Sequence, residues 1–175
     1  MKHTKNPIIF PITKEEAFDY TEPLEEGDVF KLERLIKVAT KEAENVIGMD
    51  IAYTENTVTY SEFTGNTIYL NEGNYIGIIS IYADDVSIGF DKVIDDGYRF
   101  KIELNDSQHA DELVLKYYAG YEEDSTDGNL EAIRQYVFVR VDDMFGPEKS
   151  SYSFDKLRQN ELKASNLLAS LKGFY

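Results

Sequence analysis

The pattern of apolar and polar positions divides the chain into helical ends and a β-rich middle. Between Asp28 and Ile47, apolar residues recur every three or four positions, which is the period of an amphipathic α-helix. Asp28 is a suitable N-cap for this helix, and Gly48 is a suitable residue to end it. The sequence therefore predicts a long helix that buries one apolar stripe in a core.

Between Ile51 and Ala119 the pattern changes to the alternation that is typical of strands. Residues 57–70 alternate on both sides of Thr64-Gly65-Asn66, which predicts two short strands joined by a turn. Residues 76–82 form a continuous apolar stretch and predict a further strand.

A second hairpin is predicted later in the β-rich middle. Asp95-Asp96-Gly97 contains the Asp-Gly pair that tight turns prefer, and it lies between strand candidates at 89–94 and 98–104. The polar residues 105–111 predict a loop. Residues 112–119 alternate again and predict a final strand.

Helices are predicted on both sides of this β-rich middle. Thr13 and Glu16 have the spacing of a capping box, which predicts a short helix near the N-terminus. Residues 129–145 are apolar on more than one face, so we expect a second long helix with neighbours on several sides. The β-branched valines of this stretch leave a strand as the alternative. After Gly146-Pro147, residues 153–172 predict a third long helix.

The predicted fold class is α+β: a bundle of about three long helices plus a short N-terminal helix, with a β-rich region of hairpins inserted between the first and second long helices. Pro7 and Pro11 flank three apolar residues, so the N-terminus is expected to be an extended arm on a partner or on its own domain. The predicted organisation is an arm at 1–12, a single domain at 13–172 with helical (13–48), β-rich (49–121) and helical (129–172) parts, and a tail at 173–175.

Composition limits the class of protein. The 175 residues, 42% of them apolar, suit one domain with a core. The absence of cysteine excludes disulfides and thiolate metal ligands. The N-terminus lacks the apolar run of a signal peptide, and no stretch approaches the length of a membrane span. We therefore expect a soluble, unexported protein without a membrane partner.

The charge balance is strongly acidic, with 33 acidic and 18 basic residues and a net charge of −15. The lysines are scattered along the sequence, and no basic patch of the kind that grips DNA is visible. This argues against a reader of nucleic-acid sequence. The acidity favours solubility, or a surface that does not adhere to a polyanion nearby.

The sequence contains no convincing reaction or metal site. The acidic stretch 122–128 resembles the start of a calcium loop, but with Gly128 at the sixth position the twelfth is Arg134, where a glutamate is required. His3 and His109 have no partners at zinc-binding spacing, and no phosphate loop or nucleophile elbow is present. We therefore predict no enzyme activity, no catalytic residue, no cofactor and no metal.

A family resemblance follows from the order of these parts. The strand and turn LVLKYYAGY at 113–121 precede a polar loop and a helix that begins with NLEAI at 129–133. They follow a short helix containing TKEEA, a long helix that ends at Gly48 and the β-rich middle. This order resembles the head–tail connector (neck adaptor, or head completion) proteins of tailed bacteriophages. The loop before Asn129 lacks a proline that is frequent in that family, and the β-rich middle is longer than usual.

The resemblance implies a structural virion protein of the neck, assembled in the host cytoplasm. Such proteins form a homo-oligomeric ring, commonly a dodecamer, which docks on the capsid portal and extends the DNA channel. The ring also gives the next neck or tail protein an attachment platform. Genomic DNA then passes through the channel without sequence-specific binding, which agrees with an acidic wall that repels DNA.

Two sets of residues are candidates for these contacts. In the family, the C-terminal helix and tail typically engage the portal, which on this chain implies the residues Leu167, Leu168, Leu171, Phe174 and Tyr175. The excess of apolar surface on the second long helix predicts a contact between neighbouring subunits through Tyr136, Phe138, Val139 and Phe145.

Two functions of other classes stay open. The β-rich middle could form a ligand- or carbohydrate-binding module of a phage or bacterial surface protein. Its concave aromatic surface would be built from Tyr53, Tyr60, Tyr69, Tyr75 and Tyr82. An acidic monomer or dimer could instead mimic DNA and inhibit a DNA-processing enzyme. A large ring would exclude the mimic, and a saturable glycan signal would favour the binding module.

Overall fold

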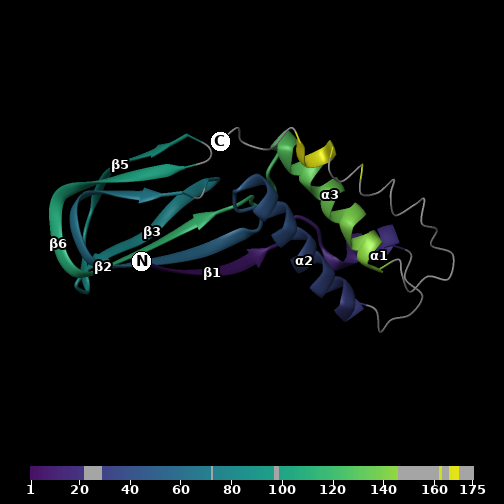
Figure 1. Ribbon diagram of the computed structural model, residues 1–175, viewed down its shortest axis with the longest axis horizontal. Helices are drawn as coiled ribbons and strands as arrows, with labels where there is room; N and C mark the ends of the chain where they lie inside the picture. Colours follow the sequence, from purple (N-terminus) through teal and green to yellow (C-terminus); the bar gives the residue numbers. More distant parts are fainter. Residues whose placement is uncertain (22–28, 72, 97–98, 146–161, 163–165, 170–175) are drawn as a thin grey trace. The chain divides into compact units, whose positions relative to one another are not determined.

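The chain forms six strands and three helices within the residues that the computed structural model describes, which are 1–21, 29–71, 73–96, 99–145, 162 and 166–169 (Figure 1). The strands are β1 (Lys2–Ile9), β2 (Tyr53–Leu70), β3 (Tyr75–Ala83), β4 (Val86–Ser87), β5 (Phe90–Asp95) and β6 (Phe100–Ala119). The helices are α1 (Lys14–Thr21), α2 (Val29–Ile47) and α3 (Gly128–Phe145). The chain divides into two compact units. We call Met1–Ile9 with Gly48–Glu122 the sheet unit, and Phe10–Ile47 with Glu123–Tyr175 the helical unit.

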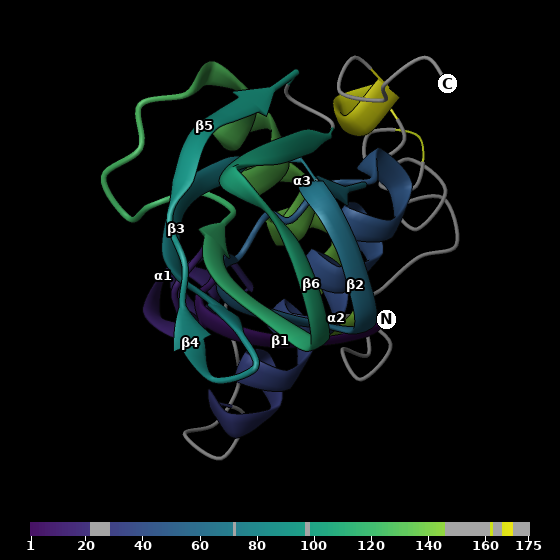
Figure 2. The same cartoon turned by 90° about the vertical axis from the view of Figure 1, so that its left-hand side faces the viewer.

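The sheet unit is one antiparallel sheet with the strand order β1-β2-β6-β3-β4, and β5 pairs with β6 beside this path. Figure 2 shows β6 next to β2, its longest partner. The C-terminal half of β6 also pairs with β3, and its N-terminal end pairs with β5. Strand β6 therefore pairs directly with β2, β3 and β5, whereas β1 and β4 pair only with other strands.

The predicted helical bundle is wrong as a fold class, because the chain is mostly antiparallel sheet with short helices. The error lies in the length of the strands. Residues 57–70 belong to a single strand, so the predicted turn at Thr64-Gly65-Asn66 is also wrong. Gly65 has a φ of 135°, and the register with β6 shifts between Gly65 and Thr67. The turn residues therefore mark an irregularity at which β2 and β6 bend together (Figure 1).

The predicted loop at 105–111 is wrong for the same reason. These polar residues lie inside β6, where Ala110 pairs with Phe63 and Gln108 pairs with Gly65. Most of their side chains are exposed. These residues are therefore polar because both faces of the strand contact solvent here, and not because the strand pairing is interrupted. Pairing between distant segments thus keeps both strands continuous where the local pattern indicates an interruption.

Other predicted strands are confirmed. The hairpin around Asp95-Asp96-Gly97 exists as β5 paired with the start of β6, and the apolar stretch at 76–82 is most of β3. The alternation of the final strand also holds, because Leu113, Leu115 and Tyr117 are fully buried. The core of the sheet is built from apolar residues of β2, β3 and β6, which include Val58, Ile68, Ile81, Ile102, Leu113, Leu115 and Tyr117.

The N-terminal arm is a strand of its own sheet. Lys2–Ile9 pair with β2 in antiparallel register, with Lys2 opposite Thr59 and Pro7 opposite Thr54. An irregularity follows Pro7, which has no N–H to give to the ladder. Of the two expectations for the arm, packing on its own chain is the one observed.

The helical unit contains the predicted short N-terminal helix as α1 and the first two predicted long helices as α2 and α3. The stripe of α2 is buried as expected, through Leu32, Ile36, Ala39, Ala43 and Ile47. The stretch 129–145 is helical, so the strand alternative does not hold. The predicted third long helix at 153–172 lies mostly outside the described residues. None of the described helices is long and apolar enough to cross a membrane.

Candidate assembly surfaces

Helix α3 is tied to its neighbours in the helical unit by two arginines. Arg134 donates a hydrogen bond to Glu16 at the start of α1. Arg140 donates two hydrogen bonds to Glu42 of α2, one from Nε and one from Nη2, and each is 3.0 Å long. Glu16 also accepts the backbone N–H of Thr13 at 2.8 Å, while its own N–H is donated to the Thr13 hydroxyl at 3.1 Å. This is the predicted capping box, and its glutamate doubles as the anchor for α3.

Each ion pair shifts the pKa of one of its members, Glu16 in the first pair and Arg140 in the second. Burial disfavours the charged form of Glu16, but the hydrogen bond from Thr13 and the charge of Arg134 outweigh it and lower the pKa of this carboxyl. Burial likewise disfavours charge on Arg140, yet Glu42 outweighs it and raises the pKa of the guanidinium. The two pairs together connect three helices.

Three of the four residues predicted for a subunit contact are buried within their own subunit: Tyr136, Val139 and Phe145. Lys31 of α2 lies 5.2 Å from the centroid of the Phe145 ring. Phe138 is half-buried and stacks on Tyr20 with the ring centroids 4.9 Å apart. Of the four predicted residues, Phe138 is thus the one with side-chain surface left for a neighbouring subunit.

The Tyr20–Phe138 stack is an aromatic pair at the surface of the helical unit. Tyr20 is 46% exposed. Burial of its hydroxyl, followed by the nearby carboxylates Asp142 and Asp143, raises the pKa of Tyr20. The stack therefore presents a neutral aromatic surface beside two carboxylates.

The residues predicted for portal docking are only partly described. Leu168 lies in a short helical turn and is 1% exposed, whereas the adjacent Leu167 is half-buried. Leu171, Phe174 and Tyr175 lie outside the described residues. Their role in docking stays a prediction.

A surface that the sequence analysis missed lies on the solvent side of α2. We call it the α2 outer stripe; it consists of Phe30, Lys31, Arg34, Lys37, Val38 and Lys41. At 100° per residue these six positions fall within about 120° of the helix circumference, opposite the buried stripe. Phe30 is 82% exposed, the most exposed of the large apolar residues described. The spacing of four basic residues within eleven positions is the signal in the sequence that indicates this surface.

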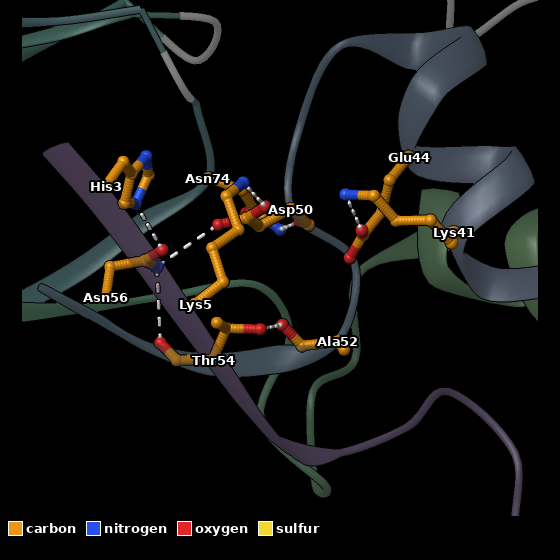
Figure 3. Close-up of polar contacts among 9 residues, drawn as sticks. All are labelled: His3, Lys5, Lys41, Glu44, Asp50, Ala52, Thr54, Asn56 and Asn74. Carbon is orange, nitrogen blue, oxygen red and sulfur yellow. Dashed lines mark hydrogen bonds and ion pairs between the residues drawn. The ribbon is translucent and has the colours of Figure 1, made fainter. Parts of the chain in front are cut away.

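In the sheet unit, a buried polar cluster fixes the point where the chain enters β2 (Figure 3). The carboxylate of Asp50 accepts hydrogen bonds from Lys5 of β1 at 2.5 Å and from the Asn56 side chain at 3.1 Å. Both Asp50 and Asn56 are almost fully buried. Asn56 interacts in turn with the His3 ring at 2.9 Å, and Asn74 donates to the Asp50 carbonyl at 3.0 Å. The cluster thus joins β1, β2 and the segment before β3.

The turn that carries the family resemblance meets the same region. Gly120 has a φ of 104°, and its N–H is donated to the carbonyl of Asn74 at 2.9 Å. The next N–H, of Tyr121, is donated to Ile51 at 3.0 Å. A Cβ at position 120 would lie 2.0 Å from the carbonyl oxygen of Ala52. Only glycine fits here, because both the backbone angle and the close approach exclude a side chain.

At the far end of the sheet unit a surface hollow of about 270 Å³ lies where β5 and β6 meet the end of β2. Its lining combines aromatic, aliphatic and charged side chains, with Tyr69, Ile94, Arg99 and Phe100 among them. Two other tyrosines considered for a ligand surface contact aromatic neighbours. Tyr53 stacks on Tyr118 with the ring centroids 4.9 Å apart, and Tyr75 lies at a tilt against Phe100 with the centroids 4.8 Å apart.

The acidic loop, residues 122–128, is described completely. Its charged side chains, Glu122, Glu123, Asp124 and Asp127, are all exposed. Asp127 accepts the N–H of Asn129 at 2.7 Å and so caps α3. Among the described residues no group of three or more His, Cys, Asp or Glu side chains is arranged to hold a metal ion.

Comparisons with known proteins bear on the fold of the whole chain. No protein-family profile matches the chain, and no curated protein matches it. Solved structures do. A chain from the neck of an empty gene transfer agent (GTA) particle, computed with C6 symmetry, matches with a TM-score of 0.73 at 11% identity. The match covers 100% of this chain and 97% of that one.

This protein shares its fold with a neck protein of these particles. The virion of a native GTA particle gives a match with a TM-score of 0.73 at 10% identity, and the neck of a native particle computed with C12 symmetry gives 0.69 at 10%. Both cover 100% of this chain and 97% of the matched chain. At the level of the fold, the predicted resemblance to head–tail connectors is therefore confirmed.

Proposed function

We propose that the protein is a non-enzymatic structural component of the neck of a tailed, phage-like particle. The observation that carries this proposal is the match of its whole length to a chain from such a neck, sheet and helices together. A match that covers both units is more informative than one confined to a common supersecondary motif.

In this role, copies of the protein assemble into a ring. Necks whose structures were computed with C6 and C12 symmetry contain the similar chains, and cyclic symmetry requires head-to-tail contacts between identical subunits. Both symmetries are compatible with the dodecamer that the family resemblance implies. In this proposal the ring docks on the portal and offers its other side to the next neck or tail protein.

The acidic character of the chain suits a channel that DNA traverses. The net charge of −15 repels a polyanion and so limits adhesion during passage. The ring thus extends the channel of the portal without sequence-specific contacts.

The test is assembly on the portal that the same genome encodes. Purified protein is mixed with that portal and examined by mass measurement and electron microscopy. We expect a ring stacked coaxially on the portal. If the protein neither binds the portal nor forms a ring at any protein-to-portal ratio, the proposed function is wrong.

Portal attachment is assigned to the C-terminal residues, as the family resemblance implies. Deleting residues 171–175 is expected to leave a folded protein that no longer binds the portal. The matched control is Ile8→Ser, which removes an exposed apolar side chain from the sheet unit and is expected to leave portal binding unchanged. Binding of the truncated protein at the wild-type level would contradict this assignment.

A further inference from the structure

The α2 outer stripe is a cationic surface on a strongly acidic protein. Three of its basic residues, Arg34, Lys37 and Lys41, are exposed, and Lys31 is half-buried. The carboxylates of α2 do not neutralise the stripe as a whole. Glu33 pairs with Lys14 at 3.8 Å, and Glu42 is held by Arg140.

Arg34 is the centre of this surface. It has no ion pair within the described part of the chain, whereas Lys41 is matched by Glu44 at 3.0 Å. Lys37 lies 5.9 Å from the ring centroid of Phe10, which leaves its charge uncompensated by a carboxylate in the described residues. The stripe therefore offers at least two cations, Arg34 and Lys37, for which the described part of the subunit supplies no carboxylate partner.

The same chain carries a surface of opposite charge. The acidic loop contains four carboxylates in six residues, and no basic residue occurs between Lys116 and Arg134. Only Asp127 is used locally, as the cap of α3. The other three carboxylates are exposed on a loop whose C-terminal end is fixed by that helix.

We propose that the α2 outer stripe of one subunit binds the acidic loop of the next subunit in the ring. The two surfaces differ, so the contact is heterologous, and repetition of a heterologous contact closes a ring when the rotation allows. Arg34 and Lys37 supply charge complementarity, which fixes register and speeds encounter. Phe30 supplies the apolar anchor. This inference rests on the proposed function, because it names the interface that forms the ring.

A DNA phosphate backbone is the other polyanion that such a stripe could meet. Two features favour the acidic loop instead. Phe30 and Val38 interrupt the cations with exposed apolar surface, and aromatic side chains and arginine are enriched in protein interfaces. The net charge of −15 also opposes the long-range attraction on which non-specific DNA binding depends.

Cysteine cross-linking tests the contact directly, because the chain contains no cysteine. In the variant Arg34→Cys/Asp124→Cys, oxidation of the protein assembled with the portal is expected to give a ladder of disulfide-linked oligomers. The control is Arg99→Cys/Asp124→Cys, which replaces an exposed arginine of the sheet unit. It is expected to remain monomeric on a non-reducing gel.

Charge reversal gives a second, independent readout. The variant Arg34→Glu/Lys37→Glu is expected to lower ring formation at least tenfold, and adding Glu123→Lys/Asp124→Lys is expected to restore most of it. The control Lys2→Glu/Arg99→Glu makes the same change in net charge at two exposed sites of the sheet unit and is expected to assemble as the wild type does.

The outcomes separate this inference from the proposed function. Rings of the Arg34→Cys/Asp124→Cys variant that give no cross-linked ladder, or full assembly of the Arg34→Glu/Lys37→Glu variant, would overturn the inference and leave the neck function standing. Normal assembly of that variant with loss of binding to a DNA duplex would assign the stripe to DNA instead. Failure of the wild-type protein to form any ring would overturn both.

Discussion

The contacts that stabilise the sheet unit internally differ in kind from those that stabilise the helical unit internally. In the sheet unit, segments far apart in the sequence pair along their whole length, as from Thr54 with Ala119 to Leu70 with Phe100. In the helical unit, each helix is defined by its own caps and stripe, and two arginines of α3 join it to α1 and α2. A single change should therefore spread further through the sheet unit than through the helical unit.

The largest effect is expected at Gly120, where the last strand meets the start of β2. In Gly120→Val the new Cβ would overlap the Ala52 carbonyl, and the backbone angle would be strained as well. The backbone of both segments must shift, so we expect a loss of more than about 3 kcal/mol in the free energy of unfolding. Urea denaturation followed by circular dichroism measures it.

The control for this change is Gly77→Ala in β3, where an added Cβ meets nothing within 4 Å. Its effect is expected to stay within about 1 kcal/mol. Equal losses at the two glycines would show that the close approach at Gly120 is not what requires glycine there.

The next largest effects come from matched cavities in the two cores. Leu115 of β6 and Ile133 of α3 are both fully buried, so replacing either with alanine is expected to cost about 2–5 kcal/mol. The two variants should differ in where amide protection from hydrogen exchange is lost. Leu115→Ala is expected to expose β2, β3 and β6 together, and Ile133→Ala mainly the three helices. Loss of protection across both units in each variant would remove the distinction between them.

The same difference explains what the sequence could predict. The stripe of α2, the capping box at Thr13 and the hairpin of β5 with β6 depend on residues within a few positions of each other, and all three were predicted. The continuity of β2 through Gly65 was not, because it depends on pairing with residues about forty positions away, which no local pattern displays. A strand prediction from alternation stops wherever polar residues occupy both faces.

For the candidate surfaces, too, the sequence predicts what depends on neighbouring positions and not what depends on distant ones. An excess of apolar residues on α3 correctly indicated several neighbours, yet the pattern cannot distinguish helices of the same subunit from those of another. The packing of Tyr136, Val139 and Phe145 within the subunit makes that distinction. The pairing of Glu16 with Arg134 joins residues 118 positions apart and leaves no sequence signal.

A smaller effect is expected at the cap of α1. Thr13→Ala removes the hydroxyl that accepts the N–H of Glu16, and such caps are worth about 1 kcal/mol. Thr13→Ser keeps the hydroxyl and is expected to be nearly neutral. Thermal unfolding of the two variants gives the comparison, and a serine variant as unstable as the alanine variant would show that the methyl group, not the hydroxyl, stabilises the start of the helix.

The smallest effect is expected from Arg134→Met, which removes the ion pair to Glu16 while keeping much of the side-chain volume. Both side chains are partly exposed, so screening by solvent limits the loss at pH 7 to under about 1 kcal/mol. The pKa of Glu16 is lower in the folded protein than in the unfolded chain. Its contribution is therefore present above the ordinary glutamate pKa and disappears as the pH falls through the lowered value.

This sign predicts that the stability difference between wild type and Arg134→Met shrinks on acidification. Urea denaturation at pH 7 and pH 3 measures it. Glu16 also binds the N–H of Thr13, so the double variant Glu16→Gln/Arg134→Met is needed to separate the pair from the cap. A coupling energy that is the same at both pH values would mean that Arg134 holds α3 by packing rather than by charge.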